Sequence, residues 1–296
     1  MQIGLIDVDG HNFPNLALMK ISAWHKAQGD TVEWWWGFGY YDIVYMSKVF
    51  DDTYSADVPE PLNAKRIIKG GTGYGLNNVL PPDVEHMYPD YSLYPKLALN
   101  TAYGFLSRGC PRGCPFCIVA GKEGRKSYKV ADLSEWWNGQ KNIVLCDPNI
   151  LACKEHIDLL HQLAESKAYV DINQGLDARL LTSENIDALN GIKVKRIHFA
   201  WDLMEQSEAV IRGLKLYLQE GKIHDPSRRI VYVLANYNTS EDEDLYRVYT
   251  LRDLGYDPYI MVYDKPNAPK EVKRLQRWCN NRRIFKSCPD FKDYKG

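Results

Sequence analysis

The chain has 296 residues, of which 45% are hydrophobic and 25% are charged, and this composition is typical of a globular protein with one large or two smaller domains. Thirty-seven Lys and Arg residues stand against 38 Asp and Glu residues, and the formal charge of −1 excludes the large basic excess that nucleic-acid-binding proteins usually carry. No stretch approaches about 18 consecutive apolar residues and the first residues lack a signal-peptide pattern, so we expect a cytoplasmic protein with neither a membrane nor a nucleic acid among its partners.

Residues 1–96 alternate between strand-like and helix-like segments. Apolar runs at 3–8, 31–36, 42–46 and 65–69 have the length of β-strands, and residues 15–28 carry apolar side chains at helical spacing. The fourth run ends in Gly70-Gly71. Strands that alternate with helices predict a parallel sheet, and we expect a small doubly wound, Rossmann-like α/β domain here.

Residues 97–280 continue the alternation with longer helices. We expect strands at 103–107, 142–146, 169–173, 196–200, 230–235 and 258–263, most of them continuous Val, Ile, Leu and Tyr runs. Residues 150–167, 242–254 and 269–279 carry apolar residues at helical spacing. Six strand–helix pairs predict a partial (βα)6 TIM-type barrel, followed by a C-terminal tail at 281–296.

Three cysteines lie on one short loop directly after the first strand of this predicted barrel. Cys110, Cys114 and Cys117 are spaced CxxxCxxC, each beside a proline or glycine, and Phe116 precedes the last of them. Three thiolates favour zinc or an iron–sulfur cluster. A structural zinc site needs a fourth side chain, whereas a four-iron cluster held by three cysteines leaves one iron open to an external ligand. A disulfide cluster, a zinc-structured binding module and an iron–sulfur electron-transfer or sensor protein are the alternatives.

The cysteine spacing, with an aromatic residue before the last cysteine, resembles the cluster loop of the radical S-adenosylmethionine (SAM) superfamily. The resemblance implies a [4Fe-4S] cluster on Cys110, Cys114 and Cys117 and bound SAM, which one electron from the cluster splits to a 5′-deoxyadenosyl radical. It also implies the partial barrel as fold, an electron donor such as flavodoxin or ferredoxin, and a small-molecule or peptide substrate.

The same resemblance implies where SAM is bound, because the carboxyl ends of the barrel strands meet at one edge. After the second strand, Asp147 and Asn149 supply acceptors for the methionyl amino group, although the superfamily's usual Gly-Gly-Glu is absent. After the third strand, Arg179 can grip a carboxylate, and Gln174 or Asp177 can hold the ribose hydroxyls.

The fourth and fifth strands end at two further positions that resemble SAM contacts, Asp202 on the ribose side and Asn236 on the adenine side. The alternative is that these polar groups only cap helices and order loops. The candidate cofactor-binding residues are Phe116, Asp147, Asn149, Gln174, Asp177, Arg179, Asp202 and Asn236. No pattern identifies a catalytic acid, base or hydrogen-atom donor.

The N-terminal domain resembles the cobalamin-binding domain that precedes the barrel in one branch of the superfamily. Gly70-Gly71 matches a glycine pair of that domain, and Asp9-x-His11 resembles the start of its DxHxxG motif, in which the histidine binds cobalt. Pro14 stands where the motif has glycine, which disfavours cobalamin. We therefore expect this domain to act mainly as a lid over the barrel.

Four further cysteines, Cys146, Cys153, Cys279 and Cys288, stand singly in the sequence. Some superfamily members bind an auxiliary cluster through extra cysteines. Because these four lack a grouped spacing, we expect buried or free thiols instead.

Overall fold

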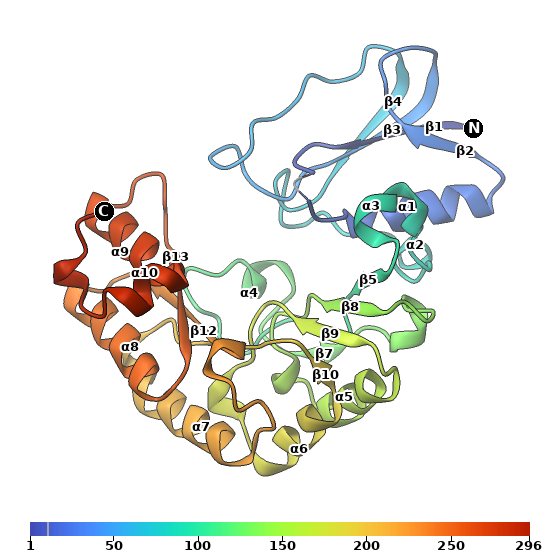
Figure 1. Cartoon of the computed structure of the whole chain (residues 1–296). Helices are drawn as coiled ribbons and strands as arrows, with labels where there is room; N and C mark the ends of the chain where they lie inside the picture. The colour runs from blue at the N-terminus through green and yellow to red at the C-terminus, as the bar shows by residue number, and fades with distance from the viewer. Residues whose placement is uncertain (11) are drawn as a thin grey trace.

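The computed structural model describes residues 1–10 and 12–296. The chain is an α/β protein with several small parallel sheets. The sheet of the N-terminal strands stands apart from the elements that follow β5, and short helices lie between the two groups (Figure 1). Within the described residues, no helix is both long and apolar enough to cross a membrane.

The first sheet contains four parallel strands in the order β2-β1-β3-β4. Their bounds are β1 Gln2–Asp7, β2 Thr31–Trp34, β3 Tyr41–Ser47 and β4 Ala64–Gly70. Helix α1 (Leu16–Ala27) begins after Asn15, whose side chain accepts the Leu18 N–H at 3.2 Å, a standard N-cap. It buries Leu18 and Ile21 in one cluster with β1.

The first sheet lacks the second long helix that a doubly wound unit would place on the face opposite α1. The described residues 48–63, which join β3 to β4, contain no helix, and Val58 of this connection packs on that face with Val44 and Met46. On the α1 face, Leu80 and Val84 of the short helix α2 (Pro82–Glu85) add to the cover. The expected alternation of strand and helix is therefore incomplete after β3.

Two hydroxyl groups tie the connecting segment to both halves of the chain. This segment contains the 3-10 turn η1 (Tyr91–Leu93) and helix α3 (Pro95–Ala98). Tyr94 donates to Asp7 Oδ2 at 2.6 Å, and Tyr91 donates to the Trp136 carbonyl at 2.6 Å. The two halves are thus joined by specific polar contacts as well as by the chain.

The strands that follow form two parallel sheets, ordered β10-β9-β8-β5 and β11-β12-β13. A parallel bridge between Leu176 and Phe199 links the sheets, and the Leu176 N–H donates to the His198 carbonyl at 2.7 Å. Within the described residues the strands do not close into a barrel. The bounds are β5 Thr101–Gly104, β8 Asn142–Leu145, β9 Tyr169–Ile172, β10 Lys193–Val194, β11 Ile197–Ala200, β12 Arg229–Ala235 and β13 Asp257–Val262.

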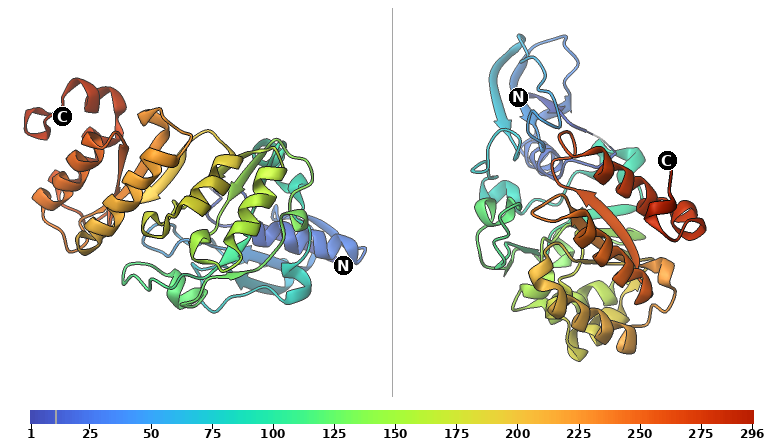
Figure 2. Two further views of the ribbon diagram at one scale, coloured as in Figure 1. Left: turned by 90° about the horizontal axis from the view of Figure 1, so that it is seen from below. Right: turned by 90° about the vertical axis from the view of Figure 1, so that its left-hand side faces the viewer.

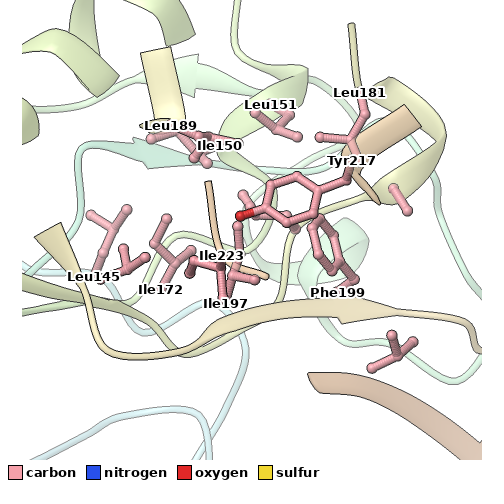
Figure 3. Packing of buried hydrophobic residues seen from close by; sticks show 14 of the residues in the cluster. Leu145, Ile150, Leu151, Ile172, Leu181, Leu189, Ile197, Phe199, Tyr217 and Ile223 are labelled. Carbon is pink, nitrogen blue, oxygen red and sulfur yellow. The ribbon is translucent and has the colours of Figure 1, made fainter. Parts of the chain in front are cut away.

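Five helices pack along the outer side of these sheets, as the arc in Figure 1 and the left view of Figure 2 show. They are α5 His156–Glu165, α6 Ser183–Gly191, α7 Ser207–Glu220, α8 Glu241–Asp253 and α9 Lys270–Asn280. Between helices and strands lies the largest buried cluster, in which Tyr217 of α7 meets Phe199 of β11 edge-on at 5.0 Å between ring centroids (Figure 3). Helix α10 (Arg282–Ser287) packs Phe285 on Trp278 of α9 at 4.8 Å.

Two predicted elements differ in the structure. The strand expected at 103–107 ends at Gly104, and Ser107–Arg108 (β6) instead pairs antiparallel with Tyr128–Lys129 (β7). Asp147 holds the chain in this turn by accepting the Leu106 and Ser107 N–H groups at 2.8 and 2.7 Å. The helix expected from residue 150 begins at His156, after the 3-10 turn η3 (Ile150–Ala152).

Candidate functional site

The cysteine loop runs from β6 to the short helix α4 (Val119–Lys122) at the carboxyl end of β5. Gly109 and Gly113 have positive φ angles of 79° and 57°, a conformation that L side chains rarely adopt. The base of the loop is fixed because the Gly109 N–H donates to Glu123 Oε2 at 2.9 Å and the Cys110 N–H donates to the Gly124 carbonyl at 3.2 Å. These glycines allow the loop to turn back on itself.

The three thiols of this loop lie close enough to one another to interact electrostatically. Cys110 and Cys114 are half-buried and Cys117 is exposed. Burial raises the pKa of the Cys114 and Cys117 thiols, and Cys110 adds to the rise at both. Within residues 1–10 and 12–296, no three His, Cys, Asp or Glu side chains are placed to hold one metal ion. Thiolates bound to different irons of a cluster lie farther apart than ligands of a single ion.

Asn149 connects the loop after β8 to the cysteine loop. It is 5% exposed, and its Nδ2 donates to Cys110 Sγ at 3.5 Å and to Asp177 Oδ2 at 3.2 Å. Its Oδ1 is buried and has no hydrogen-bond partner within the described residues. A buried acceptor beside the cysteine loop is therefore left for a donor other than the described protein groups.

Asp177 is the centre of an ion-pair network below this asparagine. Arg179 donates to it in a bidentate pair at 2.6 and 2.9 Å, and Arg112 of the cysteine loop donates to Oδ2 at 2.7 Å. Burial raises the pKa of Asp177, but the bonds from Arg179 and Arg112 outweigh it and the pKa is lowered overall. The network therefore fixes the cysteine loop against the loop after β9, and it occupies Asp177 and Arg179 with each other.

Two other predicted residues lie at the ends of β11 and β12. Burial raises the pKa of Asp202 to about 6, although Arg247 and Arg179 oppose the rise. The negative charge of Asp202 in turn helps to raise the pKa of the Cys114 thiol. Asn236 has a φ of 67°, and its Nδ2 donates to the Tyr263 carbonyl at 3.0 Å, which ties the ends of β12 and β13 together.

Phe116 extends the cysteine loop towards the same two strands. Its ring meets Tyr237 edge-on at 5.0 Å between centroids, and Tyr237 meets Tyr263 in the same way at 4.9 Å. The three rings form a row from the cysteine loop to the end of β13. Aromatic surfaces of this kind can cover the flat face of a ligand.

Asp147 and Gln174 are placed differently from the other predicted residues. Asp147 is 2% exposed, and both of its oxygens accept hydrogen bonds from Leu106 and Ser107. Gln174 is exposed, and its side chain donates to Asn173 Oδ1 at 3.1 Å. The structure therefore gives Asp147 a role in shaping the β5–β6 turn, and it leaves Gln174 outside the network around Asp177.

The sequence patterns did not identify a set of residues on the face of the sheets opposite the buried cluster. His198 Nδ1 lies 3.5 Å from Asp171 Oδ1, and the His198 ring stacks on Tyr232 at 5.4 Å between centroids. Tyr259 meets Tyr232 edge-on at 5.9 Å. Asp171 and Tyr259 are exposed. The available signal was the alternation of exposed and buried positions in β9, which identifies a strand but not the use of its open face.

The four single cysteines are separate thiols in different surroundings. Cys146, Cys153 and Cys279 are buried, and Cys288 is half-buried. Each thiol has its own nearest acceptor: the Val144 carbonyl for Cys146, Glu155 for Cys153, the Pro258 carbonyl for Cys279 and the Asp290 carbonyl for Cys288. Within the described residues these four cysteines form no disulfide, and the prediction that they bind no auxiliary cluster stays a prediction.

The residues that suggested cobalamin lie at the carboxyl edge of the first sheet. His11 lies outside the described residues. Asp9 is 5% exposed and accepts the backbone N–H groups of Val49 and Phe50 at 2.8 and 2.7 Å. Gly71, with a φ of 91°, lies directly against the Lys48 backbone. Asp9 and Gly71 therefore shape the loop that follows β3.

Hydrogen bonds thus connect Cys110, Asn149, Asp177 and Arg179. Asp202 helps to raise the pKa of the neighbouring Cys114 thiol. Residues from the ends of β6, β8, β9 and β11 meet at one edge of the sheets. No protein-family model matches the chain, and no curated protein matches it.

Proposed function

We propose that the protein is a radical SAM enzyme that modifies a small molecule or a peptide. The observation that carries this proposal is the contact between Cys110 and Asn149, whose Oδ1 is buried and has no hydrogen-bond partner within the described residues. A four-iron cluster held by the three cysteines would leave one iron free to bind SAM, and Asn149 Oδ1 would be free to accept a hydrogen bond from SAM. When bound, the cluster supplies the electron that splits SAM to methionine and a 5′-deoxyadenosyl radical.

Some residues of the chain would bind the cluster or SAM, and others would position the cysteine loop. Cys110, Cys114 and Cys117 would hold the [4Fe-4S] cluster, and Asn149 Oδ1 would accept from the methionyl amino group of SAM. Arg112 would position the loop through its pair with Asp177. Because it takes part in this pair, Asp177 contributes to the site by fixing the loop.

The adenosyl side of SAM would lie along the strand ends that follow. The proposed contacts are Asp202 for the ribose hydroxyls and the row of Phe116, Tyr237 and Tyr263 for the adenine ring. Asn236 would hold the ends of β12 and β13 in place for this row. A carboxylate that accepts from two hydroxyls and an apolar surface for a flat ring are common features of nucleoside sites.

The strand order supports a finer description of the fold. β5, β8, β9, β11, β12 and β13 follow one another in sequence order with helices on the outer side, and this fits an open (βα)6 partial barrel. Residues 97–280 would form this barrel, residues 281–296 a tail, and residues 1–96 a domain that covers the open side. We propose a cytoplasmic location and an electron donor such as flavodoxin or ferredoxin.

The open face of the sheets is the proposed substrate wall. Asp171, His198, Tyr232 and Tyr259 offer hydroxyl, imidazole and carboxylate groups to a bound molecule. The N-terminal domain would cover this wall and keep water from a radical. Phe13 contributes to the cover, since its ring meets Tyr103 of β5 at 5.0 Å.

Anaerobic reconstitution of the full chain with iron and sulfide, followed by reduction in the presence of SAM, tests the proposal. We expect 5′-deoxyadenosine and methionine as products. Iron and sulfide bound without cleavage of SAM would indicate an electron-transfer or sensor protein, and zinc bound in preference to iron would indicate a binding module. Hydroxocobalamin bound with micromolar or tighter affinity would show that the N-terminal domain is more than a lid.

A further inference from the structure

A large cavity lies between the first sheet and the elements around β5. It has a volume of about 1140 Å³, slightly above the usual range of about 300–1,000 Å³ for small-molecule sites. One wall comes from α1, β3, β4 and residues 77–87, and the other comes from β5, β6, α4, β7 and Trp136. Residues 109–121, which contain the three cysteines of the loop, supply no part of either wall. The cavity is therefore separate from the proposed SAM site.

The cavity lies on the face of the first sheet that carries α1, and α1 does not cover the whole of this face. The exposed part of the sheet presents Tyr45 of β3 and Ile68 of β4 to the cavity, together with Trp24 of α1 and Leu80. These four side chains offer an apolar surface for a hydrocarbon chain or a ring, and Lys20, Asp83 and Glu85 line the same wall beside them.

The opposite wall carries two hydrogen-bond donors without a partner in the described part of the chain. Trp136 is 3% exposed and lines the cavity, and its buried indole Nε1 has no acceptor there. A buried N–H group without a partner is costly and uncommon in native proteins. An acceptor bound in the cavity would remove this cost.

Lys122 is a cation of this wall without an ion pair. Arg108 pairs with Glu123 at 2.7 Å and lies 3.6 Å from Glu85, which Lys20 also contacts at 2.8 Å. Lys122 of α4 lines the cavity and is half-buried, and no carboxylate within the described residues lies within ion-pair distance of its Nζ. Burial, followed by the charge of Arg108, lowers the pKa of Lys122, although Glu123 and Glu85 oppose this. An anion beside Lys122 would give its ammonium group a partner.

The other charged groups of the cavity are paired within the described residues, apart from the carboxylate of Asp83. Lys129 pairs with Asp132 at 2.6 Å, and His86 Nδ1 contacts Glu135 at 2.9 Å. Lys69 pairs with Glu60 at 2.9 Å. These pairs are internally matched, whereas Lys122 and Trp136 are donors without acceptors.

We propose that this cavity binds an amphipathic anion, whose apolar body lies on α1, β3 and β4 and whose carboxylate or phosphate accepts from Lys122 and the Trp136 indole. The inference rests on the cavity and its unpaired donors, and it holds whether or not the cysteine loop binds a cluster. A carboxylate and a phosphate monoester both present anionic acceptor oxygens. The experiment below therefore compares a probe with each of these head groups.

Isothermal titration of the full chain provides the test, with dodecanoate and dodecyl phosphate as probes below their micelle concentrations. We expect one molecule to bind with micromolar affinity, and the tighter of the two probes identifies the head group. Dodecyltrimethylammonium has the same chain with the opposite charge and should bind at least tenfold more weakly. Equal binding of the cation and the anions would overturn the proposal, as would the absence of binding by both anions.

Two variants locate the bound probe. Lys122→Met should weaken anion binding at least tenfold, whereas Lys126→Met, an exposed lysine on the loop that follows α4, should leave it unchanged. Ala17→Phe fills the apolar wall from α1 and should exclude the chain of both probes. Circular dichroism and thermal melting identify any variant that fails to fold. Wild-type affinity in a folded Lys122→Met protein would place the probe elsewhere and contradict the proposal.

Discussion

The side-chain nitrogen of Asn149 lies 3.5 Å from the sulfur of Cys110 and donates to it. The contact joins the loop after β8 to the cysteine loop, and Asn149 reaches the Asp177 network through the same nitrogen at 3.2 Å. Because Nδ2 donates to these two acceptors, Oδ1 is left as an acceptor that has no partner among residues 1–10 and 12–296. Asn149 is thus the residue best placed to report on a ligand at the cysteine loop.

Asn149→Ala should weaken SAM binding to the reconstituted protein about tenfold or more, because it removes an acceptor in a buried site. Equilibrium dialysis with labelled SAM measures the change, and iron analysis shows whether the cluster is retained. Gln174→Ala is the matched control, since Gln174 is exposed and bonds only to its neighbour Asn173 in the described structure. Equal affinity in the Asn149→Ala and Gln174→Ala proteins would refute the proposed contact.

Asp147 should make the metal-free protein less stable as the pH rises. Burial raises its folded-state pKa to about 7, although the bonds from Ser107 and Leu106 oppose the rise. The folded state therefore binds the Asp147 proton more tightly than the unfolded state. The protonated Asp147 stabilises the folded state in full below about pH 4, and this stabilisation is lost as the pH rises to about 7. At about 1.4 kcal/mol per pKa unit, the contribution is on the order of 4 kcal/mol at most.

Asp147→Asn tests this assignment because the amide stays neutral. The free energy of unfolding in urea should change less between pH 5 and pH 8 in the variant than in the wild-type protein. Part of the slope should remain, since burial also raises the pKa of Asp202 and Asp257. An unchanged slope in Asp147→Asn would show that Asp147 titrates normally.

Arg247 should be essential for holding the ends of β11 and β12 together. It is fully buried, and it donates to the carbonyls of Trp201, Asp202 and Leu234 and to the carboxylate of Asp244. Arg247→Met leaves Asp244 buried without its charge partner. We expect a loss of about 3–5 kcal/mol in the free energy of unfolding, measured by urea denaturation.

Asp253→Asn serves as the control for Arg247→Met on the same helix. Its side chain is 74% exposed, and its carboxylate lies 3.7 Å from Arg252 Nε. Exposed pairs of this kind contribute about 0–1 kcal/mol. Losses of similar size in the two variants would contradict the structural role of Arg247.

The sequence predicts most of the strands because apolar runs mark buried parallel strands. The run at 230–235 and the helix at 242–254 are both found within a residue or two of the expected bounds. The strand at 103–107 is divided because Asp147, forty residues away, takes the backbone N–H groups that would have continued the ladder. A hydrogen bond between distant residues leaves no local pattern in the sequence.

Only part of the candidate site can be predicted from the sequence, for the same reason. The spacing of Cys110, Cys114 and Cys117 is local and visible, and strand ends indicate which loops meet them. Whether a polar side chain in those loops is free or already paired depends on neighbours that are distant in sequence. Asn149 keeps one acceptor free, whereas both oxygens of Asp147 are bonded within the protein.

The central claim is that three cysteines of one loop hold a cluster that cleaves SAM. The most direct measurement is the amount of iron, sulfide and 5′-deoxyadenosine obtained from anaerobically reconstituted wild-type protein and from Cys110→Ala, Cys114→Ala and Cys117→Ala. Cys288→Ala, a half-buried cysteine of the tail, is the control. We predict about four irons per chain and 5′-deoxyadenosine in the wild-type and control proteins, and loss of both in each loop variant. Full iron, sulfide and 5′-deoxyadenosine in any of the three loop variants would contradict the assignment.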